Sequence, residues 1–196
     1  MTRYAAKAWR AFRPGATAAV SVAVSDGRVL GLDPGSQRTG FGIIDGVGAA
    51  ERYVASGCID VTGSDMVTRL RRIYAAVSAL VAEHRPDMIA IERVFIHRNP
   101  DSALKLGQAR GVALCAAASG EASVHEYAPR AIKLAVTGYG AAAKPQVAQM
   151  VCTLLAIRTA LKADAADALA VALCHAHTRR ISALAGAAAA AVADVA

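Results

Sequence analysis

Short apolar runs alternate with amphipathic stretches along most of the chain. Two such runs, residues 29–32 and 41–44, are separated by polar residues and glycines. This pattern predicts a hairpin of two strands joined by a six-residue loop. Pro34 restricts its own φ, and Gly35 suits the positive φ of a type II turn. The first strand of the hairpin ends in an acidic residue, Asp33.

The same periodicities predict further strands and helices. Alternation in residues 51–61 and a continuous apolar run in 87–92 predict two more strands, and the second suits a strand covered on both faces. Apolar residues at helical spacing predict amphipathic helices between and after the strands. We expect a short strand at 124–127 and helices at 68–83, 102–119, 129–136, 145–157 and 164–177.

Small residues distinguish two of these helices. Gly107 and Gly111 are four residues apart in the helix 102–119 and predict close packing against a sheet or another helix. Beyond His177 the pattern changes, and residues 183–196 are alanine-rich without a distinct apolar face. We therefore expect the last helix to end near His177 and the tail to be frayed.

The two ends of the chain differ in composition from the region between them. Residues 1–27 combine basic residues with an Ala/Val-rich stretch, which is one property of a signal or transit peptide. Ser21 interrupts this stretch and a strand follows it, so we expect a disordered basic arm or an upstream start-site artefact. The predicted organisation is an N-terminal extension at 1–27, one domain at 28–180 and an alanine-rich tail at 181–196.

Charge and cysteine content narrow the functional classes. The chain has 22 Lys and Arg against 15 Asp and Glu, and its net charge of +7 suits a nucleic acid or an acidic membrane surface. No uncharged apolar run of about 18 residues is present, so we expect no membrane span. Four cysteines without C-x-x-C spacing disfavour zinc and predict buried free thiols in a reducing compartment, the cytoplasm.

Four acidic residues stand at the ends of predicted elements. Asp33 and Glu92 each end an apolar strand, and Asp164 and Asp167 share one face at the start of a helix. Each has an ordinary explanation, because Asp is common where strands stop and also caps helix N-termini. If these elements converge, however, four carboxylates would crowd together and require a cation. Their oxygens would select Mg²⁺ or Mn²⁺, and two such ions promote phosphodiester hydrolysis.

Six motifs occur in an order that indicates a family. They are GLDPGS at 31–36, TGFG at 39–42, SGC at 56–58, AIERVF at 90–95, NPDSALKLGQARG at 99–111 and ADAADALA at 163–170. This arrangement resembles the bacterial RuvC-type Holliday-junction resolvases of the ribonuclease-H-like superfamily, over residues 28 to about 178. The resemblance implies an α/β fold with a mixed, ribonuclease-H-like β-sheet flanked by α-helices.

The resemblance also implies a catalytic centre and its substrate. Asp33, Glu92, Asp164 and Asp167 would be the catalytic, metal-binding acids, with Mg²⁺ or Mn²⁺ as cofactor and two ions in each active site. The implied reaction is symmetric nicking of two opposed strands of a four-way DNA junction, which leaves ligatable ends. The implied assembly is a homodimer that cooperates with the RuvA–RuvB branch-migration complex.

Other residues are expected to bind DNA. By resemblance, Lys133 and Lys144 match lysines that contact DNA or support cleavage, and we expect Lys105 to meet phosphates as well. Phe95 matches an aromatic residue that stacks on bases at the junction. Stacking on an unpaired base contributes about 1–3 kcal/mol in single-strand binders. The alternative for Phe95 is packing on the hairpin.

Two other functional classes fit parts of the sequence. ATP-binding proteins of the actin, sugar-kinase and Hsp70 type have a similar first hairpin, but they need two lobes and a second phosphate loop, for which 196 residues leave no room. A junction-binding protein without catalysis is the other alternative. The presence of all four acids favours an endonuclease, and a cleavage assay separates the two.

Deletion of residues 1–27 is expected to leave the melting temperature and the cleavage of a synthetic four-way junction nearly unchanged. The reason is that this segment contains no matched motif, and chain ends are usually dispensable unless they are tied to the fold. Thermal melts and cleavage rates of the full chain and of a variant that starts at Arg28 test this. Aggregation or lost cleavage in the shorter variant would show that the segment belongs to the fold.

Overall fold

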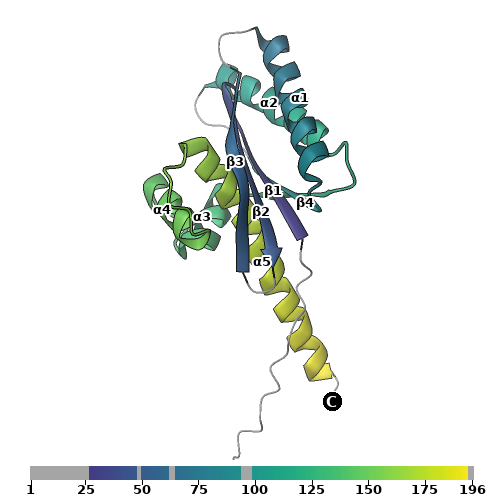
Figure 1. Ribbon diagram of the computed structural model, residues 1–196, viewed down its shortest axis with the longest axis vertical. Helices are drawn as coiled ribbons and strands as arrows, with labels where there is room; N and C mark the ends of the chain where they lie inside the picture. The colour runs from purple at the N-terminus through teal and green to yellow at the C-terminus, as the bar shows by residue number, and fades with distance from the viewer. Residues whose placement is uncertain (1–26, 48–49, 62–64, 94–98, 194–196) are drawn as a thin grey trace, which may run out of the picture.

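A five-stranded mixed sheet separates two groups of helices in the computed structural model (Figure 1). The structure describes residues 27–47, 50–61, 65–93 and 99–193. The strands are β1 (Gly27–Pro34), β2 (Arg38–Val47), β3 (Ala50–Asp60), β4 (Met88–Glu92) and β5 (Ser123–Tyr127). The helices are α1 (Met66–His84), α2 (Pro100–Ala117), α3 (Pro129–Thr137), α4 (Lys144–Leu154) and α5 (Ala163–Ala193).

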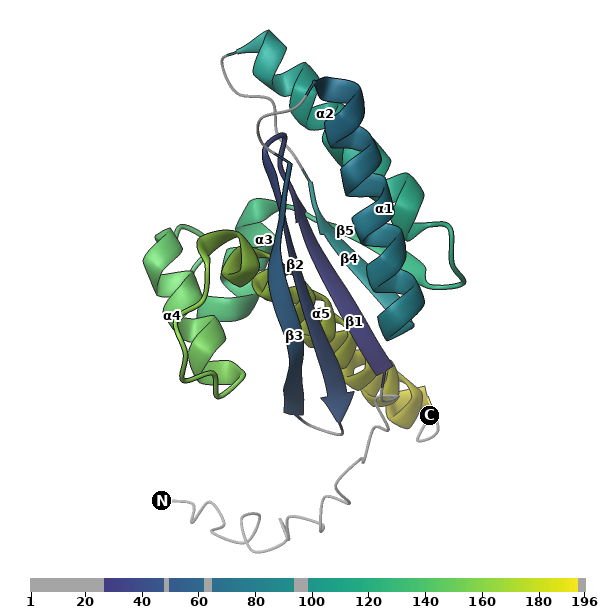
Figure 2. The same ribbon diagram turned by 45° about the horizontal axis from the view of Figure 1, so that its top comes forward.

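The sheet has the strand order β3-β2-β1-β4-β5. The first three strands form an antiparallel meander, and β4 and β5 continue the sheet parallel to β1. Figure 2 shows α1 and α2 on one face of the sheet, and α3, α4 and α5 on the other. The prediction of an α/β fold with a mixed sheet flanked by helices is therefore confirmed.

Side-chain alternation along the inner strands divides the core into two layers. Leu30 and Leu32 of β1 pack with α1 and α2, whereas Val29 packs with α5. The parallel neighbour β4 alternates in the same way, because Ile91 belongs to the first layer and Ala90 to the second. Both strands are therefore covered on both faces, as their apolar runs predict.

Glycines in the hairpin allow α5 to lie directly against the sheet. A Cβ at Gly31 would lie 2.1 Å from the backbone oxygen of Ala168, and a Cβ at Gly40 would lie 2.0 Å from that of Asp164. Real side chains do not tolerate such distances, so both positions require glycine. The first turns of α5 are thereby placed immediately above the end of β1 and the start of β2.

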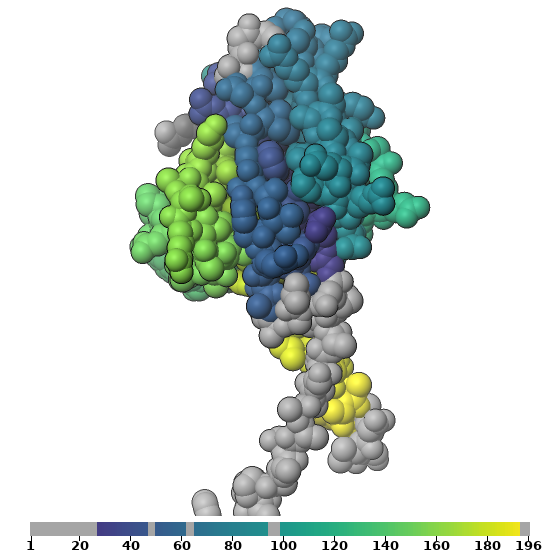
Figure 3. Space-filling model, viewed as in Figure 1, coloured from purple at the N-terminus to yellow at the C-terminus, as the bar shows by residue number. Residues whose placement is uncertain are grey.

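The helix α5 is longer than the sequence pattern predicts. It continues to Ala193, so the expectations of an end near His177 and of a frayed tail are wrong for the described residues. Alanine has the highest intrinsic helix propensity, and it maintains the helix without a face to pack. In Figure 1 and Figure 3 the end of α5 extends beyond the sheet.

Two glycine predictions are also wrong. Gly35 does not have a positive φ, since among the described glycines that conformation belongs to Gly138, with φ of 74°. The loop between β1 and β2 is limited to residues 35–37, because pairing of the hairpin extends further than expected. A Cβ at Gly107 or Gly111 would meet no atom within 4 Å, so close packing at these glycines does not occur within the described chain.

Two predictions from composition have mixed outcomes. The four cysteines are free, but only Cys174 is fully buried, and Cys115 is exposed, which corrects the expectation of buried thiols. Among the described residues, no helix combines the length and apolar character needed to cross a membrane. The predicted extension at 1–27 lies outside the described residues except for Gly27.

Gly31→Ala is expected to lower the free energy of unfolding by about 1–3 kcal/mol, because the added methyl group would overlap the Ala168 carbonyl and displace α5. Gly107→Ala is the matched control. It adds the same group in open space within a helix and should stabilise the protein by about 0.5–1 kcal/mol. Urea unfolding of both variants measures the difference, and similar effects at the two sites would contradict the close approach of α5.

Candidate active site

The ends of β1 and β4 bring Asp33 and Glu92 together. The two strands are parallel and paired through Leu32 and Ile91, so the residues that follow this pair are neighbours. Alternation turns both acidic side chains toward α5, the face on which Ala90 packs in β4 and on which a Cβ at Gly31 of β1 would meet α5. A hydrogen bond joins the two carboxyl groups.

Burial and mutual repulsion raise the pKa values of both acids. For Glu92, burial is the largest cause, followed by the charge of Asp33 and their hydrogen bond, and together they raise the pKa to about 7. The pKa of Asp33 is raised first by burial and then by the charge of Asp167. Glu92 therefore keeps its proton to a higher pH than an ordinary glutamate does.

The first turns of α5 add Asp164 and Asp167 to this cluster. The backbone of Asp164 lies against Gly40 of β2, and Asp167 follows one turn later. Lys144, at the start of α4, places Nζ 2.7 Å from Oδ2 of Asp167. The lysine charge also lowers the pKa values of Asp33 and Glu92, although burial and repulsion outweigh it at both. The structure thus brings all four predicted acids and one predicted lysine together.

The remaining predicted DNA-binding residues lie elsewhere. Lys133 is half-buried on α3. Lys105 is exposed on α2, where it forms an ion pair of 2.5 Å with Asp101. Phe95 lies outside the described residues, so its predicted stacking or packing has no structural counterpart here.

Cys58 is a contact of the site that the sequence alone did not indicate. Its Sγ donates to Oδ2 of Asp164 at 3.5 Å, and pairing of β2 with β3 places it opposite Gly40. Burial first, and then the hydrogen bond to Asp164, raise the pKa of the Cys58 thiol and keep it in its donor form. The motif at 56–58 drew attention to this segment in the sequence. The contact of Cys58 with Asp164 could not be predicted, because it depends on strand register and on the position of α5.

The four acids have the donor chemistry of a hard-cation site. Carboxylate oxygens suit Mg²⁺ and Mn²⁺, and the raised pKa values of Asp33 and Glu92 reflect burial first and then neighbouring negative charge, which a divalent cation would offset. As the described side chains stand, no three His, Cys, Asp or Glu residues are grouped closely enough to hold a metal ion. The residue types fit a metal ion, but these side chains would have to move closer together to hold one.

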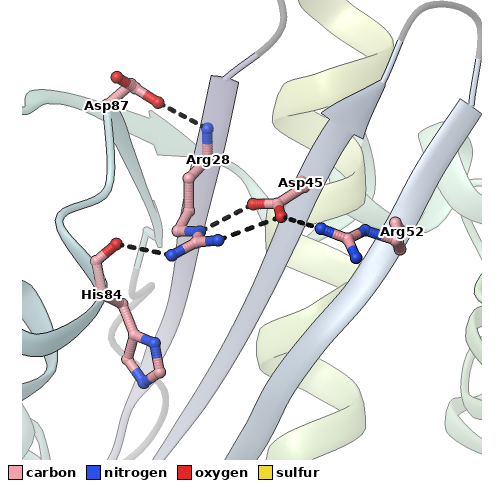
Figure 4. A network of polar contacts seen from close by, with 5 residues as sticks. All are labelled: Arg28, Asp45, Arg52, His84 and Asp87. Atoms are coloured by element: carbon pink, nitrogen blue, oxygen red, sulfur yellow. Dashed lines mark hydrogen bonds and ion pairs between the residues drawn. The ribbon is translucent and has the colours of Figure 1, made fainter.

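A second polar network, at the opposite end of the sheet, has a different character (Figure 4). Arg28 donates to both carboxylate oxygens of Asp45 at 2.7 and 3.1 Å, and Arg52 donates to Asp45 at 2.8 Å. Arg28 also donates to the backbone oxygen of His84 at 3.0 Å. The hydrogen bond with Arg28 is the largest cause that lowers the pKa of Asp45. Each carboxylate oxygen of Asp45 is paired with an arginine, which indicates that this network stabilises the fold.

Comparison with known proteins identifies close relatives. The family model described as "Crossover junction endodeoxyribonuclease RuvC" matches residues 29–175. The protein of that name from Methylococcus capsulatus is 54% identical over 153 residues, which cover 78% of this chain and 92% of the relative. The one from Alkalilimnicola ehrlichii is 52% identical over 150 residues, which cover 76% of this chain and 91% of the relative.

A solved structure agrees with these relatives. RuvC of Thermus thermophilus in complex with a Holliday junction substrate superposes with a TM-score of 0.75 at 34% identity. The match covers 80% of this chain and 97% of that chain. Sequence and fold therefore point to the same family.

The raised pKa of Glu92 predicts how the stability of the metal-free protein depends on pH. A carboxyl group whose pKa is higher in the folded state binds its proton more tightly when folded. The stability that the tighter binding of this proton contributes is therefore lost as pH rises from about 4.5 to about 7. Glu92→Gln removes this titration, so the variant should be more stable than the parent at pH 8 and gain less at pH 5.

Urea unfolding of both proteins in the presence of a chelator measures this difference. Subtracting the free energy of unfolding of one protein from that of the other cancels groups that do not interact with Glu92, including His175 and His177, whose pKa values shift in opposite directions. A difference of the same size at both pH values would contradict the raised pKa.

Proposed function

Because the chain belongs to the RuvC family of crossover junction endodeoxyribonucleases, we propose that it resolves four-way DNA junctions by metal-dependent nicking of two opposed strands. The observation that carries this proposal is the convergence of four carboxylates at two strand ends and one helix start. A binding protein without catalysis gains nothing from this arrangement, because burying several carboxyl groups beside one another is costly.

Asp33, Glu92, Asp164 and Asp167 are the proposed metal ligands. Bound Mg²⁺ or Mn²⁺, two ions in this proposal, would supply electrostatic stabilisation of the charge that develops on the phosphate during hydrolysis. The protein's part is to hold the carboxylates on β1, β4 and α5, three elements fixed by the core. The thiol of Cys58 orients one of them through its contact with Asp164.

We propose a role for Lys144 both in the metal-free site and in the site with metal bound. In the structure it neutralises Asp167, and its side chain is 77% exposed. With a metal ion held by Asp167, the ammonium group of Lys144 would donate to a phosphate oxygen beside the scissile bond. A charge-assisted contact of this kind both positions DNA and stabilises developing negative charge.

Junction DNA is the proposed substrate, as in the Thermus thermophilus complex. The net charge of +7 supports binding of a polyanion, and Lys105, Lys133 and Phe95 are proposed contacts outside the acid cluster. Symmetric nicks in two opposed strands require two active sites, which supports a homodimer with twofold symmetry. Cooperation with a RuvA–RuvB complex in the cytoplasm is part of the same proposal.

Asp33→Asn and Asp167→Asn are expected to leave junction binding intact or stronger, while cleavage slows by orders of magnitude. Each change removes one negative charge with little change in shape, so metal affinity falls and repulsion of phosphate decreases. Asp45→Asn is the matched control, because it changes an acid at the opposite end of the sheet (Figure 4) and should retain cleavage.

Gel shifts and cleavage assays on one synthetic junction, read beside thermal melts, provide the measurement. If Asp164 and Asp167 only stabilise the start of α5 through their charge, their Asn variants lose about 0.3–1 kcal/mol of stability and still cleave at low temperature. Cleavage near the parental rate by Asp33→Asn or Asp167→Asn would contradict the metal-site assignment.

A further inference from the structure

We propose that Arg110 is a positioning residue of the active site, which fixes the direction of the Glu92 side chain from the opposite face of the sheet. Arg110 belongs to α2, whereas the acids face α5. This inference rests on the proposed function, since it concerns a residue that we propose as a metal ligand. Its basis is a set of contacts at the end of β4.

The first contact is with the backbone of Glu92. Arg110 Nε donates to the carbonyl oxygen of Glu92 at 3.2 Å. The pairing of β4 with β1 ends one residue earlier, at Leu32 and Ile91. Arg110 thus supplies a donor to β4 beyond the point where its ladder with β1 stops.

The second contact fixes the other side of the same peptide unit. The amide of Arg93 donates to the carbonyl oxygen of Tyr127 at 2.7 Å. The Glu92 carbonyl and the Arg93 amide belong to one planar peptide group, so bonds to both restrict its rotation. The Cα atom of Glu92 lies in this plane, and its orientation sets the direction in which the carboxyl group leaves the strand.

The guanidinium group is itself held in place. Arg110 Nη2 lies 2.8 Å from Oε1 of Glu126, and the Arg110 side chain is only 20% exposed. Glu126 pairs with Ile91 across the sheet, so alternation turns it toward α2. Arg93 approaches the second oxygen of Glu126 at 3.5 Å. The planar fork of arginine meets both a carbonyl and a carboxylate, which the single ammonium of a lysine cannot reproduce.

The test uses two measurements on Arg110→Ala. The first is hydrogen exchange of the Arg93 amide in the metal-free protein, which should accelerate at least about tenfold while amides in β2 and α5 keep their rates. The second is calorimetric titration with Mn²⁺. By analogy with outer-shell partners of metal ligands, the variant should bind Mn²⁺ about 10–100-fold more weakly.

Three variants make these measurements specific. Arg52→Ala removes an arginine that pairs with a carboxylate at the far end of the sheet, and it should change neither quantity. Arg110→Lys should remain impaired in Mn²⁺ binding, because it lacks the fork. Glu126→Ala removes the partner of the Arg110 guanidinium but keeps the guanidinium itself, and it should also weaken Mn²⁺ binding. This variant replaces Arg110→Ala in the test if Arg110→Ala does not fold.

Glu92→Gln provides the reference that separates this inference from the proposed function. Suppose that Glu92→Gln lowers Mn²⁺ affinity but Arg110→Ala leaves either the exchange rate at Arg93 or the Mn²⁺ affinity unchanged. This result would overturn the positioning role of Arg110 and leave the metal site intact. Unchanged Mn²⁺ affinity in Glu92→Gln would overturn the assignment of Glu92 as a ligand, and with it the inference.

Discussion

The contact between α5 and the glycines of the first hairpin is the constraint on which the site depends. Without side chains at Gly31 and Gly40, the helix backbone lies against β1 and β2, and its first turns reach the strand ends. Asp164 and Asp167 enter the cluster only because of this approach. The glycine motifs of the hairpin and the acidic motif 163–170 are therefore two halves of one structural requirement, although more than 120 residues separate them.

Concentrating carboxylates at one point opposes folding. Two features reduce the repulsion: the pKa of Glu92 rises to about 7, so it takes up a proton more readily, and Lys144 lies against Asp167. Asp45 shows the contrasting solution, in which two arginines stabilise the ionised form. The same fold thus stabilises the ionised form of Asp45 and holds Asp33 and Glu92 in surroundings that disfavour ionisation, and the second condition is typical of functional sites.

Most elements follow from local pattern, because continuous apolar runs and helical spacing reflect burial directly. Asp33 and Glu92 could be selected from sequence because each ends such a run. Contacts that depend on register between distant segments could not be predicted. Cys58 meets Asp164 only through the pairing of β3 with β2, and Arg110 reaches Glu92 only because α2 crosses the opposite face. The prediction of a frayed tail was wrong for another reason. The helix propensity of alanine alone maintains α5 where it has no face to pack.

In the proposed function, the four carboxylates form a metal-dependent centre that cuts DNA junctions. The most direct measurement is incubation of a synthetic four-way junction with the chelator-treated protein while Mg²⁺ is titrated back, followed by mapping of the nicks. We expect junction binding without cleavage before Mg²⁺ is added, and paired nicks at symmetric positions of two opposed strands afterwards. Cleavage in the presence of the chelator, or binding that never leads to nicks with Mg²⁺ or Mn²⁺, would contradict it.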